Sequence, residues 1–394
     1  MARWFLFSLL LFSTFWLGAQ HCGSDLLTNT QEQQERIART EAFTARWIAD
    51  RPAMAREVLS IPVVVHIVYQ DEEDNIPESY VYDAIEALNA DFRALNDLSI
   101  VPNAFSDLIA DTEIEFCIAA TPNANQPAIM KTQTDVTNIG VASTNGQRRI
   151  FYSELGGSTP ADVSQYLNLY VCDMGGIIGQ GIYPDNAEGQ EDGVLINFSV
   201  FGRGDYLDPP YDLGRTLTHE VGHYLNLRHI WGSSISDCSE DDLVNDTPNS
   251  GKNYLGDCVA SGNSCGSNDM PTNFMYYTDD ACMANFTPGQ KLRMMATLAG
   301  PRAGLGNADC VAVATQEPQW AASVRVFPNP VRERLFVELP IGHSATLRLR
   351  NALGQSVRTG ISGAGMPTTE LPSGLYFLEI RIQEETLIKR VVVP

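Results

Sequence analysis

Apolar positions follow two different periods along residues 57–310. The β-branched run at 61–69 predicts a buried strand, and residues 79–96 repeat apolar positions at helical spacing, which predicts an amphipathic helix packed on a sheet. A further helix is expected at 212–227, before a loop-rich stretch from 230 to 300. Other strands are expected at 114–120, 166–173 and 193–200. This order predicts an α+β domain with a twisted mixed sheet, helices and a loop-rich lower half.

The two ends of the chain have different patterns. An apolar run within residues 1–19, preceded by Arg3 and followed by small residues, predicts a secretory signal peptide. Residues 20–56 are polar, with helical character at 32–49, and we interpret them as a propeptide. A change of composition at 311–322 indicates a linker. Short alternating strands then predict a small all-β sandwich at 323–394: they are expected at 324–327, 334–339, 346–351, 374–382 and 387–393.

Charge and cysteine content limit the partners. The net charge of −22 argues against nucleic acid, which requires a basic surface, and beyond the signal peptide we expect no membrane-spanning segment. Export would permit disulfides among the eight cysteines. The four that cluster in the loop-rich stretch allow three pairings: Cys238, Cys258, Cys265 and Cys282. Cys117 and Cys172 either pair or remain buried thiols, and Cys310 has no obvious partner.

One short stretch carries the strongest chemical signal. His219 and His223 are four residues apart, so on a helix their imidazoles share one face and can bind a single ion, with His229 completing a three-nitrogen site. Three protein ligands leave a position for water, and Glu220 is placed to accept a proton from that water. The pattern predicts a catalytic zinc site; the alternative is a site that keeps its ligands without activity. His66 is expected in the core of its strand, without metal.

The extended motif resembles that of the metzincin metallopeptidases. The strings at 219–232 and 273–283 resemble the pappalysin family, especially its cytophagalysin- and ulilysin-like members, over about residues 60–300. The resemblance implies a metzincin fold with Met275 in a turn beneath the zinc, whereas Met283 is more typical of core packing. Asn226 stands where the family usually has glycine, and we expect it to adopt a left-handed conformation. Tyr276 departs from an aspartate that is common in the family.

The resemblance also implies roles for other side chains. Tyr277 matches a tyrosine thought to stabilise the oxyanion, although it could be simply a packed aromatic. The implied disulfides are Cys238–Cys265 and Cys258–Cys282. Family propeptides carry a cysteine near the position of Cys22, which could occupy the open zinc position of a zymogen or be an incidental thiol.

Acidic residues suggest two further sites. The loop at 237–248 could bind calcium, for which the resemblance points to Asp242, Thr247 and the carbonyl of Asn245, with Asp246 as an alternative; it could also be a solvated loop. Asp279 and Asp280 lie near the region where the family builds the pocket for the residue after the cut. A buried carboxylate there would favour Arg or Lys.

Residues 324–394 resemble the C-terminal sorting domain of the type IX secretion system, through the strings at 326–330, 374–378 and 389–393. The alternative is an ordinary carbohydrate-binding or fibronectin-like sandwich, but few aromatic residues are present to bind sugar.

These observations favour a secreted zinc endopeptidase that is made as a zymogen, cuts protein or peptide substrates and uses the type IX machinery for export. Zinc and calcium are the expected cofactors, and Arg46, Arg51 and Arg56 are possible maturation sites. Two alternatives remain: a catalytically inactive, zinc-retaining surface-binding protein, and an adhesin that acts through its tail.

Overall fold

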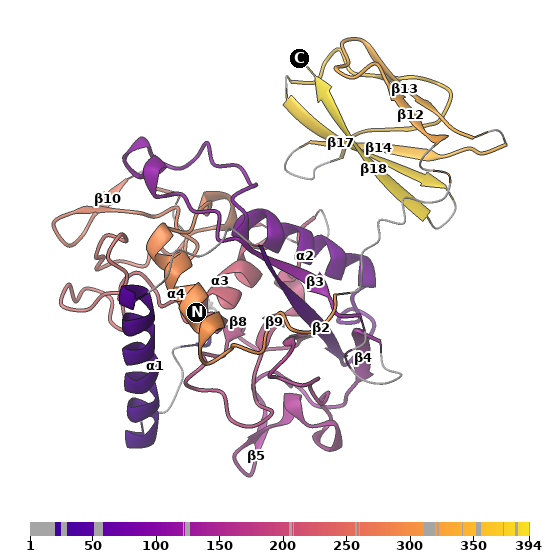
Figure 1. Cartoon of the computed structure of the whole chain (residues 1–394). Helices are drawn as coiled ribbons and strands as arrows, with labels where there is room; N and C mark the ends of the chain where they lie inside the picture. The colour runs from indigo at the N-terminus through magenta and orange to yellow at the C-terminus, as the bar shows by residue number, and fades with distance from the viewer. Residues whose placement is uncertain are drawn as a thin grey trace, which may run out of the picture.

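The fold was analysed in a computed structural model of the whole chain (Figure 1). The structure describes residues 20–24, 30–50, 58–120, 122, 127–204, 207, 209–256, 258–259, 261–310, 320, 323–340, 342–351, 356–372, 374–382 and 385–393. The expected signal peptide at 1–19, the segment 51–57 with Arg51 and Arg56, and the expected linker apart from Trp320 lie outside these residues.

A seven-stranded mixed sheet forms the centre of the larger unit, in the order β1-β8-β9-β7-β2-β3, with β4 also paired to β2. The strand β2 is buried over nearly its whole length, as its β-branched run predicts. The strands β8 and β9 pair antiparallel, whereas the other neighbours are parallel. The strands are β1 (Gln20–Cys22), β2 (Leu59–Tyr69), β3 (Ile114–Ile118), β4 (Ile129–Gln133), β7 (Leu167–Cys172), β8 (Ile177–Gly181) and β9 (Val194–Asn197).

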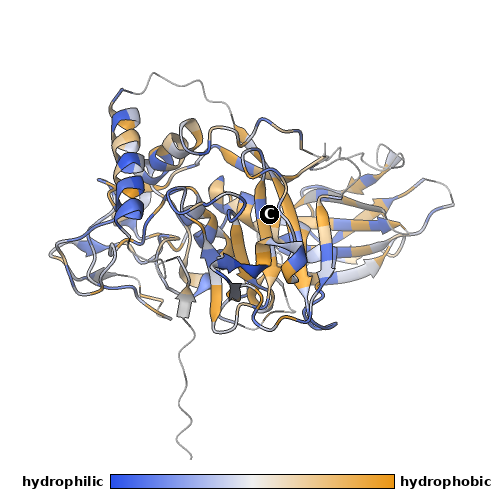
Figure 2. Ribbon diagram, turned by 90° about the horizontal axis from the view of Figure 1, so that it is seen from below, coloured by the Kyte–Doolittle hydropathy of each residue, from blue (hydrophilic) through white to orange (hydrophobic). Residues whose placement is uncertain are grey.

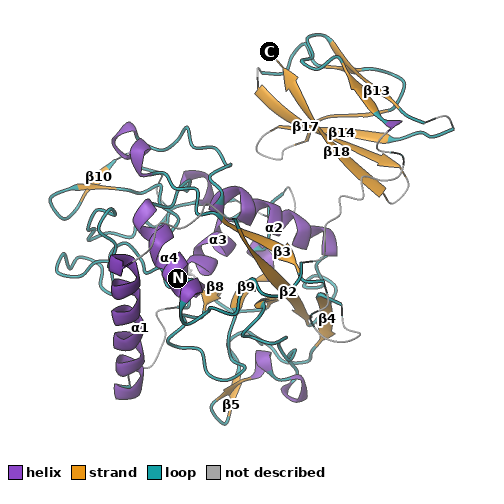
Figure 3. Cartoon of the chain, viewed as in Figure 1, coloured by secondary structure: helices purple, strands orange, loops and turns teal. Residues whose placement is uncertain are grey.

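Two helices pack on this sheet, and both are shorter than the sequence pattern predicts. The helix α2 (Glu78–Phe92) packs on β3, and α3 (Arg215–Tyr224) packs on α2, β8 and β9 (Figure 3). The predicted range of 212–227 for α3 was too long because residues with positive φ lie at both ends: Gly214 (φ 83°) before it and Asn226 (φ 71°) after it. Apolar side chains of the helices and the strands form one continuous core, and the central strands carry the hydrophobic colours in Figure 2.

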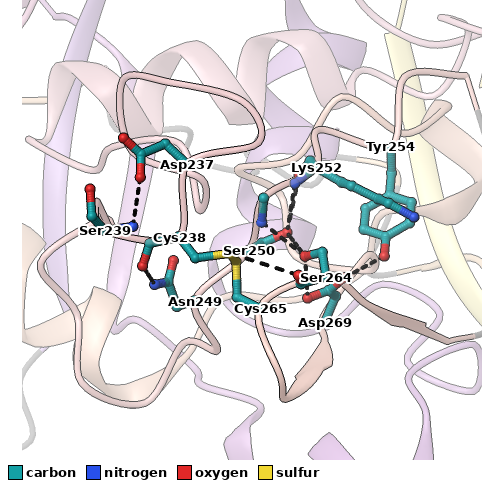
Figure 4. The surroundings of a disulfide bond; sticks show 11 residues. Asp237, Cys238, Ser239, Asn249, Ser250, Lys252, Tyr254, Ser264, Cys265 and Asp269 are labelled. Atoms are coloured by element: carbon teal, nitrogen blue, oxygen red, sulfur yellow. Dashed lines mark hydrogen bonds between the residues drawn. A yellow bond between two sulfur atoms is a disulfide. The ribbon is translucent and has the colours of Figure 1, made fainter.

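The stretch after α3 contains little regular structure, as expected. Its elements are the two-residue strands β10 (Gly262–Asn263) and β11 (Asn268–Asp269), a short 3-10 turn at Asp280–Cys282 and the helix α4 (Pro288–Ala299). The disulfides Cys238–Cys265 and Cys258–Cys282, which the family resemblance implied, are present. Figure 4 shows how the first lies against a polar cluster of loop residues.

The remaining cysteines correct one prediction. Cys117 of β3 does not pair with Cys172; it forms a disulfide with Cys310, whose partner was not evident from the sequence. A bridge between Ala119 and Cys310 shows that the chain after α4 returns to the edge of the sheet at β3. Cys172 remains a buried thiol in β7. This disulfide therefore fastens the end of the larger unit to the strand near its start.

The C-terminal residues form a separate sandwich with its own apolar core. One sheet has the order β12-β13-β16 and the other β15-β14-β17-β18. The predicted strands are present, and β15 and β16 were missed. The strands are β12 (Arg325–Phe327), β13 (Arg334–Glu338), β14 (Thr346–Asn351), β15 (Ser356–Ile361), β16 (Met366–Pro367), β17 (Gly374–Ile382) and β18 (Glu385–Val393).

The larger unit also contains a two-stranded hairpin of β5 (Ser143–Thr144) with β6 (Gln147–Arg148).

The N-terminal segment contacts the larger unit at two places. The strand β1 adds to the sheet edge by parallel pairing with β8, and α1 (Gln31–Asp50) lies alongside α4 (Figure 1). Among the described residues, no helix combines the length and the apolar character needed to cross a bilayer.

Candidate metal centre

Three imidazoles converge on one point, as the sequence pattern predicted. The Nε2 atoms of His219, His223 and His229 are 3.0, 3.1 and 3.2 Å apart in their three pairs. Tetrahedral zinc with Zn–N distances of roughly 2.0–2.1 Å holds its nitrogen ligands roughly 3.3 Å apart. The spacing of the rings therefore fits a single zinc ion. All three side chains are buried.

The helix and the turn after it explain this convergence. His219 and His223 are one helical turn apart on α3, and the left-handed Asn226 reverses the chain so that His229 faces them. The Nδ1 atom of His219 is 2.7 Å from the carbonyl of Phe274, and that of His223 is 2.8 Å from the carbonyl of Leu227. Carbonyl acceptors at Nδ1 keep the proton there, which leaves Nε2 available for a metal.

The imidazole of His223 is also held in its neutral form. Burial lowers the pKa of His223 well below its usual value, and the neighbouring imidazoles of His229 and His219 act in the same direction. The hydroxyl of Tyr183 lies 2.8 Å from the Nδ1 atom of His223. Metal binding requires neutral imidazole, so the environment favours the ligand form.

Met275 lies directly beneath the helix that carries two of the histidines. It is fully buried, and a Cβ atom placed on Gly222 would come within 2.6 Å of its sulfur. The glycine inside the histidine motif therefore makes room for the methionine. This is the position that the family resemblance implied for Met275; Met283 is buried in the same core cluster.

Glu220 lies against the edge of the sheet through a contact that the sequence did not reveal. Its carboxylate accepts a hydrogen bond of 2.7 Å from the backbone N–H of Gly181 in β8. A Cβ atom on Gly179 would lie 2.6 Å from the Glu220 side chain, and one on Gly181 would lie 2.0 Å from its carbonyl oxygen. The Gly-x-Gly pattern at the end of β8 could have indicated this contact from the sequence, since glycine in a strand often marks a close approach of another segment.

The segment after the expected signal peptide covers this site. A ligand atom of Cys22 lies within 4.8 Å of those of the three histidines, and its Sγ atom is 3.5 Å from the Glu220 carboxylate. The hydroxyl of Ser24 donates a hydrogen bond to the same carboxylate at 3.2 Å. It also accepts one from the backbone N–H of Gly181 at 3.1 Å. Ser24 was not anticipated from the sequence. It helps to hold the segment over both the metal centre and the glutamate.

Aromatic side chains surround the third histidine. The indole of Trp231 stacks on His229 with ring centroids 4.4 Å apart, and the half-buried Tyr277 packs against both rings at 4.8 Å. Tyr276, which replaces the aspartate common in the family, is fully buried and packs edge-on against Tyr254. Tyr276 therefore serves as a core residue at the wall of the pocket beside the histidines, whereas Tyr277 packs directly against His219 and His229.

A pocket opens beside the histidines, and only one of the two acidic residues considered for specificity lines it. Asp280 lines this pocket together with Tyr211 and Arg215, whereas Asp279 is absent from the lining residues. Asp280 is buried and accepts hydrogen bonds from the backbone N–H groups of Leu213 and Arg215. Burial raises its pKa to about 7, although these N–H groups and the charge of Arg215 oppose the shift.

The loop suspected of binding calcium contains a buried carboxylate. Asp242 accepts hydrogen bonds at Oδ1 from the hydroxyl of Thr247 and from the N–H of Val244, but its buried Oδ2 has no hydrogen-bond partner among the described residues. Burial raises the pKa of Asp242 to about 7. Asn245 is exposed nearby. Asp246 accepts hydrogen bonds from Thr287 and Gly289 at the start of α4, so its carboxylate is already used there.

His66 has no part in this centre. It is fully buried in β2, where its ring nitrogens contact Ser158 and Asn168 at 2.8 and 3.0 Å, and burial lowers its pKa to about 4. The prediction that it is a core residue of its strand agrees with this position.

Comparison with known proteins identifies the fold around this centre. Residues 159–299 match the Peptidase_M43 family, described as pregnancy-associated plasma protein-A, and residues 325–394 match the secretion system C-terminal sorting domain. A solved structure of a promirolysin mutant from Tannerella forsythia is 33% identical, with a TM-score of 0.64 over 73% of this chain and 97% of that chain. The chain belongs to the pappalysin family of zinc metallopeptidases.

Other relatives agree with this placement in the pappalysin family. Mature mirolysin from Tannerella forsythia, solved in complex with a cleaved peptide, is 36% identical with a TM-score of 0.57, over 64% of this chain and 96% of that chain. An extracellular metalloprotease from Arthroderma benhamiae is 35% identical over 150 residues, which are 36% of this chain and 50% of the relative. Extracellular metalloprotease 1 from Coccidioides posadasii is 38% identical over 146 residues, or 35% of this chain and 51% of the relative. The match thus spans about half the length of these curated relatives.

Proposed function

We propose that this chain is a secreted, zinc-dependent endopeptidase made as a zymogen. The observation that carries the proposal is the set of three buried imidazoles whose Nε2 atoms lie within 3.2 Å of one another, beside the carboxylate of Glu220. His219, His223 and His229 would hold the zinc, and Met275 and Asn226 would shape the site beneath and behind it. The sorting domain at the C-terminus supports export to the cell surface or beyond.

The chain's own residues account for the chemistry. When bound, zinc acidifies a coordinated water and polarises the scissile carbonyl. Glu220, once the propeptide has left, accepts the proton from the attacking water and returns it to the leaving amine. The ring of Tyr277 lies beside those of His219 and His229, and its hydroxyl would donate a hydrogen bond to the developing oxyanion.

The N-terminal segment supplies latency in this proposal. Cys22 lies on the open side of the three histidines, and Ser24 and Cys22 both contact the carboxylate that must receive the proton. A cysteine thiolate is a good zinc ligand, so Cys22 would exclude water from the metal until the segment is removed. The related promirolysin from Tannerella forsythia is, by its name, a pro-form of that relative.

Asp280 is the residue that we connect with specificity. Its carboxyl lines the pocket beside the metal centre, whereas the nearby cation Arg215 forms a buried ion pair with Asp91. The remaining negative charge favours Arg or Lys as the residue after the cut. Asp279, which is half-buried and outside the pocket lining, is assigned no such role.

We also propose a calcium site formed by Asp242, Thr247 and the carbonyl of Asn245. The supporting observation is the buried Oδ2 atom of Asp242, which no donor in its described surroundings satisfies. An unsatisfied buried carboxylate is costly, and a hard cation would neutralise it.

The test uses the purified full chain, matured and assayed on casein with and without a zinc chelator, beside a Glu220→Ala variant. Loss of Glu220 should reduce the rate by about 100- to 10,000-fold, because the general base is removed. A Cys22→Ala variant should be active without maturation. If the matured protein binds zinc but cuts nothing, the inactive surface-binding alternative is correct instead. Cutting that survives both the chelator and the Glu220→Ala change would refute the zinc mechanism.

A further inference from the structure

An aromatic ring packs on the third histidine, whereas the first two direct their Nδ1 atoms at backbone carbonyls. His219 and His223 belong to α3 and direct their Nδ1 atoms at the carbonyls of Phe274 and Leu227. His229 lies beyond the helix, after the turn at Asn226. The contact on its ring face is the indole of Trp231, with centroids 4.4 Å apart and ring planes within 8° of parallel.

Trp231 is itself firmly held and touches a second functional side chain. Only 3% of its surface is exposed, and its ring meets Tyr277 edge-on at 4.8 Å and Tyr276 at 5.9 Å. Aromatic pairs of this kind fix the relative orientation of the two rings. The same indole therefore contacts the third histidine and the tyrosine proposed to stabilise the oxyanion.

We propose that Trp231 is a positioning residue that fixes the imidazole plane of His229 and the place of Tyr277. This inference rests on the proposed zinc site. Residues that orient a metal ligand contribute about 10–100-fold to metal affinity. Trp231→Leu should therefore weaken zinc binding at least tenfold and also lower kcat more than it raises KM, because Tyr277 acts in the transition state.

The experiment measures zinc affinity of the full chain by competition with a chromophoric chelator, and the absorption bands of the cobalt-substituted protein. Trp231→Phe keeps an aromatic face and should retain most of the affinity with a small band shift. Phe105→Leu alters a buried aromatic in a separate core cluster and should change neither. Unchanged affinity and bands in Trp231→Leu would overturn the inference. If that variant does not fold, unchanged cobalt bands in Trp231→Phe would do so. Failure of the unmodified chain to bind zinc would instead overturn the proposed function.

A separate observation concerns α1, far along the propeptide from Cys22. Glu41 of α1 accepts hydrogen bonds from Arg228 at 2.9 Å and from Arg293 at 2.8 Å. Burial alone would raise the pKa of Glu41, but the two guanidinium groups outweigh it and hold the pKa below its usual value. The carboxylate is therefore charged and bridges two cations near neutral pH.

Both cations contact or belong to the turn between α3 and His229. Arg228 precedes His229, and Arg293 of α4 also donates to the carbonyl of Asn226, the left-handed residue of the turn. Asp185, a buried carboxyl near Arg228, has its pKa raised by burial, with Arg228 opposing the shift and Glu41 adding to it. Glu41 thus joins the propeptide to the turn behind the metal centre.

The rest of α1 makes fewer polar contacts with the larger unit. Gln33 donates to Asn186, and Arg36 forms a largely exposed ion pair with Glu188. Exposed ion pairs contribute little, whereas a half-buried carboxylate with two guanidinium partners contributes more. Glu41 is therefore the strongest polar anchor of the described part of α1.

We infer that Glu41 is a second anchor of the propeptide, acting through Arg228 and Arg293 at the turn before His229 and independently of Cys22. This inference rests on the proposed zymogen. Loss of the anchor should allow the N-terminal segment to leave the cleft more often while the rest of the fold stays intact.

Two thiols of the chain provide matched reporters for this test. Cys22 is itself part of the N-terminal segment and is buried while that segment is docked, whereas Cys172 is fully buried in the core and reacts only when the whole unit unfolds. The full chain is prepared in a Glu220→Gln background to prevent self-cleavage, and labelling of each cysteine by a thiol reagent is followed by mass spectrometry. Glu41→Gln should speed labelling of Cys22 at least tenfold and leave that of Cys172 unchanged.

Glu35→Gln is the control on the same helix, because the side chain of Glu35 is exposed and accepts its hydrogen bond from Gln31 of α1 itself. It should leave both rates unchanged. Equal labelling of Cys22 in Glu41→Gln and the unmodified chain would overturn the anchor, and so would a parallel rise at Cys172, which would indicate general destabilisation. Rapid labelling of Cys22 in the unmodified chain would instead contradict its proposed role in latency.

Discussion

The two halves of the peptidase unit hold their shape by different means. In the sheet half, up to α3, apolar side chains of the strands and of α2 and α3 interlock in one core. In the loop-rich half, between α3 and α4, residues such as Phe274 and Met275 join the same core, but two disulfides and polar contacts such as those of Asp269 with Tyr254 and Ser264 are needed in addition (Figure 4). The histidines on α3 are thus held by packing, whereas the loop-rich half adds covalent and polar restraints to its packing. Each half should respond to a different perturbation.

The largest effect is expected from the sheet half. Phe92 of α2 is fully buried and packs edge-on against Phe116 and Phe286. Phe92→Ala should lower the free energy of unfolding by about 3–5 kcal/mol, because a large cavity is left in the core. Tyr82→Ala, at a 54% exposed position of the same helix, should cost less than about 0.5 kcal/mol. Urea unfolding measures both, and a Phe92→Ala cost as small as that of Tyr82→Ala would refute the packing argument.

The loop-rich half should depend on its cross-links. Removing Cys238–Cys265, which joins residues 27 apart, by alanine substitution of both cysteines should cost about 3.5 kcal/mol of chain entropy. The loosened loop should then be cut by added protease between residues 239 and 264 under native conditions. Ser267→Ala, at an exposed position of the same loop, is the control. Resistance of the double variant equal to that of the control would show that the disulfide does not hold this half.

Calcium should reverse the effect of one substitution in the loop-rich half on the stability of the fold. Without calcium, Asp242→Asn should stabilise the fold, because it removes a buried carboxylate whose Oδ2 lacks a partner among the described residues. With calcium at about a hundred times its Kd, the unmodified chain should gain about 2.7 kcal/mol, and the variant should gain nothing. Thermal unfolding with calcium and with a chelator tests both signs. An identical calcium response of the two proteins would exclude Asp242 as a ligand.

The smallest effect is expected where the two halves meet. Asp280, from the loop-rich half, accepts hydrogen bonds from Leu213 and Arg215 at the start of α3. Asp280→Asn should lower the preference for Arg or Lys after the cut by about tenfold, close to the about 1.5 kcal/mol of a hydrogen bond to a charged group. The relative kcat/KM of matched peptide substrates measures this preference.

The same preference should depend on pH. Since the pKa of Asp280 is raised to about 7, the carboxyl is charged above that pH and neutral below it. The preference of the unmodified protein should therefore fall on acidification through pH 7, whereas that of Asp280→Asn should stay constant. A preference that is independent of pH in both proteins would remove Asp280 from the specificity pocket.

The contrast between the halves also explains what the sequence could predict. The strand β2 and the helix α2 were predicted within a few residues, because their apolar periods reflect burial on the sheet. The left-handed Asn226 was predicted because it stands where the family that the motif resembles usually has glycine. By contrast, β8 was missed: its five residues include two glycines, whose role is to let α3 approach.

Long-range contacts were harder to predict from the sequence. The three-residue strand β1 carries no period of its own and exists through its pairing with β8. The Cys117–Cys310 disulfide joins residues 193 apart, so no local pattern indicates it. The ion pairs of Glu41 with Arg228 and Arg293 likewise connect α1 to distant parts of the chain. The metal ligands were predictable because three of them lie close together in the sequence, whereas their supports do not.

The parallel pairing of β1 with β8 has a consequence for solubility as well as for the proposed latency. While β1 is paired, the outer hydrogen-bonding groups of β8 are covered by another segment of the same molecule. If the N-terminal segment is removed as proposed, β8 becomes the last strand of the sheet, and its N–H and C=O groups face solvent beside the cleft. An uncovered edge can add a strand from a foreign chain, so the proposed maturation would also create a surface prone to self-association.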